Sequence, residues 1–216
     1  MVAFANTWFV ANSPLISEVD WIETKPSAYL AQDQSTFDME AQFENYRSGS
    51  STEISHAVVF CDSLPCDDHF QNHTQWLAEV ESQTTQIFSV LQVALKKLAA
   101  VKGQKTVTLV TDIFGIGGVS SSKAASALSG GVIGMAKSLA KEMSRYDLAI
   151  NVVAIGSLPQ INIDSRLNAA QLKLVKMTSL GSEVNDAALP AALQFLQTSG
   201  MSVTGQVIRM DGGLLI

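Results

Sequence analysis

Residues 105–156 decide the fold: KTVTLVTDIFG at 105–115, KAASALSGGVIGMAKSLAKEMSRY at 123–146 and LAINVVAIG at 148–156. The first and third segments are short apolar runs rich in β-branched residues, which is typical of buried strands. The middle segment is long and carries apolar residues at helical spacing, so it predicts a helix. A strand, a helix and a second strand in this order predict a pair of parallel strands joined by a crossover helix.

The rest of the chain continues this alternation. Strands are predicted at 2–11, 56–61 and 203–210, with a weaker candidate at 27–31. Helices are predicted at 37–48, at 76–98 ending near Gly103, and at 185–198 ending at Gly200. The predicted fold class is therefore α/β, a Rossmann-like doubly wound parallel sheet with helices on both faces.

Composition limits the classes of partner. The chain has 216 residues, a net charge of −6 and a pI near 5.0, which argues against nucleic acid. It contains no run of eighteen apolar residues, and it does not begin with the basic segment of a secretory signal peptide. We therefore expect no membrane partner and a cytoplasmic location. Only 16% of the residues are charged, which favours a surface partly buried in an oligomer.

Three segments carry a family resemblance. GVIGMAKSLAKEM at 131–143, INVVAIG at 150–156 and the ending VTGQVIRMDGGLLI at 203–216 resemble the short-chain dehydrogenase/reductase family. The corresponding family segments read GVIGLTKSLAKEL, VNAVAPG and ITGQ-x-x-x-VDGG. The resemblance implies a single domain over 1–216 with a short-chain dehydrogenase type of Rossmann fold. Residues 56–216 match well, whereas 1–55 match weakly and would be a truncated, degenerate nucleotide-binding part.

The resemblance also assigns the positions of the catalytic residues. The family's Ser, Tyr and Lys fall on Asp112, Ala125 and Ser129 with their spacing intact, and its helix Asn falls on Gln83. In the family the Tyr transfers a proton, the Lys lowers the pKa of that Tyr and holds the nicotinamide ribose, and the Ser hydrogen-bonds the substrate oxygen.

None of the replacements can do this chemistry. Ala125 has no proton to transfer, and Ser129 carries no charge that would lower a neighbour's pKa. The carboxylate of Asp112 has the wrong sign to stabilise a developing alkoxide. A shifted register would place an active site elsewhere, but none of the three tyrosines is followed by Lys four residues later. We expect no catalytic residue in this chain.

The nucleotide-binding turn is missing as well. A Rossmann domain places a glycine-rich turn after its first strand so that backbone N–H groups can approach a pyrophosphate. The first glycine of this chain is Gly49, and Trp8 and Phe9 are expected to crowd the pyrophosphate volume. The family's Asn-Asn-Ala-Gly after the fourth strand falls on residues 60–63. The alignment places Thr7, Ala11 and Ser13 at the positions of the family's glycines. We expect this chain to bind no cofactor.

A possible metal site is a weaker hypothesis. Cysteine and histidine are the usual zinc ligands, and four of them occur within thirteen residues: Cys61, Cys66, His69 and His73. Only two residues separate Cys66 from His69, which is not a zinc-finger spacing. A solvated polar loop is the simpler interpretation, so no metal is expected.

These observations predict a pseudoenzyme. The chain would be the non-catalytic subunit of a hetero-oligomer, two copies of it with two of an intact short-chain dehydrogenase paralogue that binds NAD. In the family, the helices at 76–98 and 131–143 and the C-terminal ending form subunit interfaces. The paralogue would oxidise a hydroxyacyl-CoA, such as that of anaerobic toluene catabolism.

Two alternatives stay open. One is a stand-alone module that binds a small molecule or acyl-CoA in a cleft around Asp112 and Ser129. The other is an enzyme with new chemistry on Asp112 or on the cluster from Cys61 to His73.

Overall fold

A single parallel sheet organises the protein. The computed structural model describes residues 6–11, 28–29, 36–49, 53–61, 73–118, 123–156, 176–181, 185 and 187–215. Within these residues the strands follow the order β2-β1-β3-β4-β5-β6, and every neighbouring pair is parallel. The strands are β1 (Thr7–Ala11), β2 (Ala28–Tyr29), β3 (His56–Phe60), β4 (Lys105–Asp112), β5 (Leu148–Ile155) and β6 (Val207–Met210).

The strand order reverses next to β1. The chain first moves from β1 to β2 on one side, and then returns to place β3 on the other side of β1, with Thr7 opposite His56. Such a reversal is the switch point at which doubly wound sheets place their ligands, beyond the carboxyl ends of the strands. The predicted Rossmann-like fold is confirmed.

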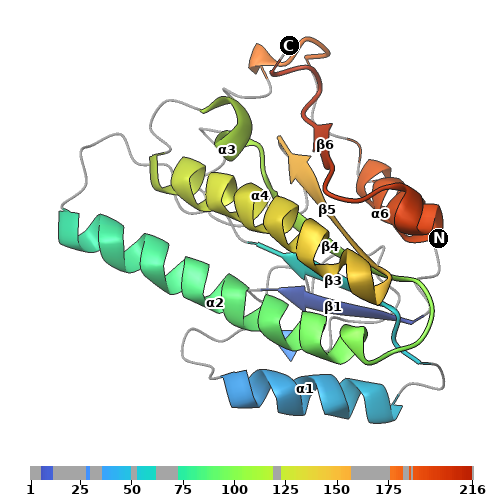
Figure 1. The fold of residues 1–216 in the computed structure, drawn as a ribbon. Helices are drawn as coiled ribbons and strands as arrows, with labels where there is room; N and C mark the ends of the chain where they lie inside the picture. Colours follow the sequence, from blue (N-terminus) through green and yellow to red (C-terminus); the bar gives the residue numbers. More distant parts are fainter. Residues whose placement is uncertain are drawn as a thin grey trace.

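Helices cover both faces of the sheet (Figure 1). One face carries α2 (His73–Ala99) and α4 (Lys123–Met143), which lie side by side, and α1 (Thr36–Gly49) packs beside α2. The opposite face carries α6 (Ala188–Ser199). The short helix α3 (Phe114–Gly117) follows β4 at the carboxyl edge. Short 3-10 turns follow α4 and α6, at Ser144–Tyr146 and Gly200–Ser202.

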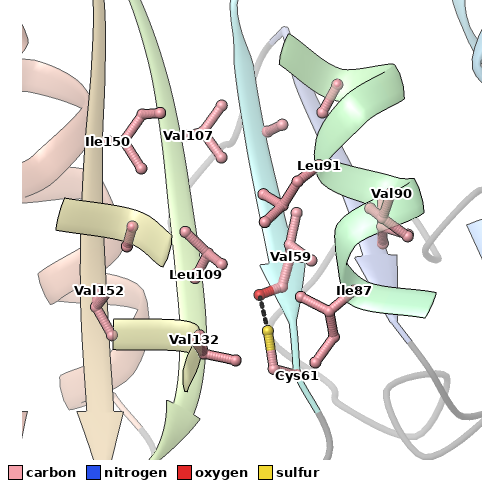
Figure 2. Close-up of a cluster of buried hydrophobic side chains, with 14 of the residues drawn as sticks. Val59, Cys61, Ile87, Val90, Leu91, Val107, Leu109, Val132, Ile150 and Val152 are labelled. Atoms are coloured by element: carbon pink, nitrogen blue, oxygen red, sulfur yellow. Dashed lines mark hydrogen bonds between the residues drawn. The ribbon is translucent and has the colours of Figure 1, made fainter. Parts of the chain in front are cut away.

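Alternate residues of each strand enter opposite halves of the core. Trp8 and Val10 of β1 face α1, α2 and α4, whereas Phe9 faces α6. Figure 2 shows Val132 of α4 and Ile87 of α2 packed among the strand side chains on the first of these faces. This period of two explains why short apolar runs indicate the positions of the strands.

The last strand is shorter than predicted. Residues 203–206 form a turn, with Gly205 at φ +70°, and strand β6 begins at Val207. The side chain of Asn151 holds this turn: its Nδ2 donates to the carbonyl of Val203 at 2.8 Å, and its Oδ1 accepts the N–H of Gln206 at 3.0 Å. These two hydrogen bonds therefore satisfy the side-chain amide of Asn151, which is fully buried in β5. Among the described residues, no helix is both long and apolar enough to span a bilayer.

Candidate functional site

The family's Ser position lies at the carboxyl edge of the sheet. Asp112 is the last residue of β4, and its Oδ1 accepts the backbone N–H of Phe114 at 2.8 Å. This side chain-to-backbone bond forms the turn from which α3 starts. At this position, therefore, one carboxylate oxygen of Asp112 holds the backbone of its own chain.

The family's Tyr and Lys positions are buried inside the chain. Ala125 is 0% exposed and Ser129 is 1% exposed, one turn apart on α4. The Oγ of Ser129 donates a hydrogen bond to the carbonyl of Ala125 at 2.8 Å. The hydroxyl of Ser129 is therefore satisfied within α4, and neither side chain lines an open cleft.

Helix α3 lies directly against this stretch of α4. A Cβ added to Gly115 would lie 2.2 Å from the backbone nitrogen of Gly130 and 2.6 Å from the carbonyl carbon of Ser129. Only glycine permits so close a backbone approach. Helix α3 therefore packs against α4 at the position of the family's Lys.

The C-terminal hook (residues 211–215) packs against the same edge. Asp211 accepts the N–H groups of Gly213 at 3.0 Å and Leu215 at 3.3 Å, and Arg209 donates to the carbonyl of Leu215 at 2.6 Å. A Cβ on Gly117 would lie 2.3 Å from Cδ2 of Leu215, so Leu215 contacts α3 directly. The hook is not predicted from the sequence, although Asp-Gly is a common turn signal.

The hook also bears on an interface prediction. The ending is expected to contact another subunit, and residues 214–216 to reach that subunit's substrate pocket. In this structure Leu214 and Leu215 pack against the core of their own chain, and the contact with another subunit stays a prediction. Residue 216 lies outside the described residues.

The alignment of the nucleotide end was wrong in one respect. Thr7, Trp8 and Phe9 all lie within β1, and all three side chains are buried. Trp8 packs edge-on against Phe43 of α1, with ring centroids 4.9 Å apart. These residues are therefore core residues and do not crowd a turn beyond the strand.

Strand β1 ends at Ala11, and Ser13 lies outside the described residues. The sequence contains no glycine between that strand and Gly49, so the prediction of an absent glycine-rich turn still stands on the sequence. Strand β3 ends at Phe60, one residue before the end of the predicted strand, and residues 62 and 63 are outside the described part. Gln83 is half-buried on α2.

The cysteine and histidine cluster is only partly described. Cys61 is a buried core residue whose Sγ lies 3.8 Å from the carbonyl oxygen of Val59, the contact drawn in Figure 2. His73 is the exposed first residue of α2. Cys66 and His69 lie outside the described residues. Among the residues described, no three Cys, His, Asp or Glu side chains gather as a metal site would require.

The remaining histidine lies at the amino ends of the strands, opposite the candidate site. His56 is the first residue of β3, and its Nδ1 lies 2.8 Å from Oγ1 of Thr106 on β4. Burial lowers the pKa of His56 below its ordinary value. The amino ends of the strands lie away from the switch point, so we assign His56 no part in the candidate site.

The chain has recognisable relatives. No family model matches it. It is 30% identical over 141 residues to the 3-oxoacyl-[acyl-carrier-protein] reductase MabA of Mycobacterium avium, covering 62% of this chain and 53% of the relative. It is 26% identical over 144 residues to an acetoacetyl-CoA reductase of Acinetobacter, covering 66% and 58%. The chain thus spans little more than half the length of these two relatives.

Solved structures confirm the fold. A short-chain dehydrogenase from Bacillus anthracis superposes with a TM-score of 0.77 at 14% identity, covering 98% of this chain and 87% of that one. A short-chain oxidoreductase from Pseudomonas aeruginosa PAO1, described as having an atypical catalytic center, gives a TM-score of 0.74 at 16% identity and covers 96% of each chain. These structures show that the chain has the Rossmann-like fold of short-chain dehydrogenases, and over part of its length its sequence is similar to the two reductases.

Proposed function

We propose that this chain is a non-catalytic subunit of a hetero-oligomeric, NAD-dependent short-chain dehydrogenase. The observation that carries the proposal is the burial of the two positions on α4 that hold the catalytic Tyr and Lys in the family. Ala125 and Ser129 are buried, and the hydroxyl of Ser129 is bonded to the carbonyl of Ala125. General acid–base catalysis needs a titratable group within hydrogen-bond reach of the substrate, and these positions supply none.

The neighbouring contacts support the same reading. An active site needs space at the carboxyl edge for a nicotinamide and a substrate. Here Asp112 bonds to the backbone that starts α3, and α3 packs against α4 at Gly115 and Gly130. The carboxylate and the space beside Ser129 are thus used for packing within the chain. This also weakens the alternative of a stand-alone acyl-CoA binding module in a cleft around Asp112 and Ser129.

Exposed apolar residues support a role as a subunit. Leu77 and Phe88 on α2 are 45% and 52% exposed, and Phe195 on α6 is 53% exposed. Strand β6 forms one edge of the described sheet. Large apolar side chains that remain exposed are a common feature of interaction sites. We propose that α2 with α4, and β6 with α6, contact other subunits in an assembly of two copies of each chain.

The names of the relatives support the proposed substrate class. The reductases that the chain resembles are named for acyl thioesters, acetoacetyl-CoA and 3-oxoacyl-[acyl-carrier-protein]. We propose that the catalytic partner oxidises the hydroxy group of an acyl-CoA thioester. We propose that the complex is similar to 2-(hydroxy(phenyl)methyl)succinyl-CoA dehydrogenase of anaerobic toluene degradation, with this chain in the place of an inactive subunit.

Co-expression with an intact short-chain dehydrogenase paralogue tests the proposal. The two chains are expected to co-elute in size-exclusion chromatography, and all NAD-dependent turnover should disappear when the paralogue's own catalytic Tyr is replaced by Phe. If turnover persists in that complex, this chain is itself an active oxidoreductase. If the chains elute separately and the paralogue is fully active alone, the subunit role is wrong.

A further inference from the structure

A row of polar side chains lies on the α6 face of the sheet, at the amino ends of the strands. His56 is the first residue of β3, and it pairs in register with Thr7 of β1 and Thr106 of β4. The residue after each of these three faces the other half of the core, so the three side chains share the face that α6 covers. Both threonines are buried, and His56 is half-buried between them. A side chain that binds a proton near neutral pH therefore lies within a mostly buried polar row.

Hydrogen bonds connect this row to the sheet and to α6. Nδ1 of His56 lies 2.8 Å from Oγ1 of Thr106. On the other side of the row, Nε2 of Gln197 in the last turn of α6 donates to Oγ1 of Thr7 at 3.2 Å. Val58, two residues after His56 on the same face of β3, packs in one apolar cluster with α6. The end of α6 thus packs directly beside the imidazole.

Within the described residues, no carboxylate faces His56 from the elements around it. Strands β1 and β5 and helix α6 contain no titratable side chain. On β4, Lys105 faces the other half of the core, where its Nζ donates to the carbonyl of Val101 at 2.8 Å, and Asp112 is at the far end of the strand. Glu53 is exposed before β3 begins. A proton on His56 therefore adds a charge that no described anion balances, which agrees with the pKa of His56 being lowered by burial.

We infer that protonation of His56 loosens α6 from the sheet and thereby makes the contact of α6 with another subunit sensitive to acid. An imidazolium is better solvated by water than by threonine hydroxyls, and water gains access when the end of α6 moves away. The open form therefore binds the proton more tightly than the closed form, and acid favours opening. Because one proton is taken up, opening increases by at most about tenfold for each pH unit below about 6.5.

The inference adds a regulatory property to the proposed function, and its assembly half rests on that function. Helix α6 carries Phe195, which is 53% exposed and belongs to the surface proposed to contact another subunit. When α6 loosens, this side chain is no longer held in one position, so the contact should weaken. The loosening itself is measurable on this chain alone. Its failure is therefore distinguishable from failure of the non-catalytic role, which concerns turnover in the complex with the paralogue.

Hydrogen exchange of the purified chain tests the loosening. At about pH 5.5 the amides of α6 should be at least about tenfold less protected than those of α4. Their exchange should depend little on low concentrations of urea, which distinguishes a partial opening from global unfolding. At about pH 7.5 the same opening should be about tenfold rarer.

Replacement of the imidazole tests whether His56 is responsible. His56→Gln should remove the change in α6 protection between the two pH values, since glutamine does not titrate. If circular dichroism shows that this variant is unfolded, His56→Thr serves the same purpose, because a β-branched residue suits a strand. His73→Gln, at the exposed first residue of α2, is the matched control and should behave like the wild type.

Size-exclusion chromatography of the complex with the paralogue tests the assembly half. The complex should dissociate at about pH 5.5 with the wild-type chain and stay intact with His56→Gln. The inference is overturned if α6 protection does not change with pH, if His56→Gln keeps the change, or if α6 exchanges only by global unfolding. A wild-type complex that stays intact while α6 loosens would overturn the assembly half.

Discussion

The contact between α3 and α4 can be tested with one added methyl group. In Gly115→Ala the new Cβ would lie 2.2 Å from the backbone nitrogen of Gly130, whereas ordinary contacts begin near 3.4 Å. The obstructing atoms are backbone, so α3 or α4 must move by about 1 Å or more. Overpacking of this kind costs roughly 1–3 kcal/mol. In a chain of this size that corresponds to a fall in melting temperature of about 2–12 °C.

The matched control lies on the other side of the same contact. In Gly130→Ala the new Cβ would lie 3.8 Å from the Cα and the carbonyl oxygen of Gly115, which is ordinary van der Waals contact. Alanine also favours the helix by about 1 kcal/mol relative to glycine. We therefore expect Gly115→Ala to lower the free energy of unfolding in urea, measured by circular dichroism, and Gly130→Ala to leave it equal or higher. Equal stability of the two variants would refute the close packing of α3 against α4.

Three further predictions concern the site, the pH dependence and the C-terminal hook. The triple change Asp112→Ser, Ala125→Tyr and Ser129→Lys should restore no NAD-dependent turnover, because the cofactor must first be bound and oriented. Turnover above background without a partner would show that this chain has a working nucleotide site. Burial lowers the pKa of folded His56, so the unfolded state binds more protons just below pH 6.5 and the free energy of unfolding should fall as the pH drops through about 6.5. His56→Gln should flatten that part of the urea-unfolding profile, and an unchanged profile would assign the dependence to other groups. Leu215→Ala should lower the free energy of unfolding by about 1–3 kcal/mol, since the side chain is partly buried against α3; a neutral effect in thermal unfolding would mean that the hook does not pack there.

The strands and long helices could be predicted because their signals are local. Alternation places Trp8 and Phe9 on opposite faces of β1, and the apolar spacing of α2 and α4 is helical over many turns. The alignment with the family nevertheless places Trp8 and Phe9 beside the pyrophosphate volume, because a first strand without a following glycine offers no landmark for its end. Their burial in the core follows from strand pairing with β3, which no local pattern encodes.

The contacts that close the carboxyl edge could not be predicted from the sequence. Helix α3 is four residues long, too short to show a helical period. Leu215 meets Gly117 almost a hundred residues earlier in the chain, and the requirement for glycine there appears only in three dimensions. The identities of Asp112, Ala125 and Ser129 were readable from the sequence, but their burial and the bond from Ser129 to Ala125 were not.

Titration of the purified chain with NAD(H) tests the central claim most directly. A non-catalytic subunit without a glycine-rich turn should give no saturable heat in isothermal titration calorimetry, even at millimolar cofactor. An intact short-chain dehydrogenase titrated under the same conditions provides the positive control. A dissociation constant below about 100 µM for this chain would contradict the account, because affinity at that level requires an organised nucleotide site.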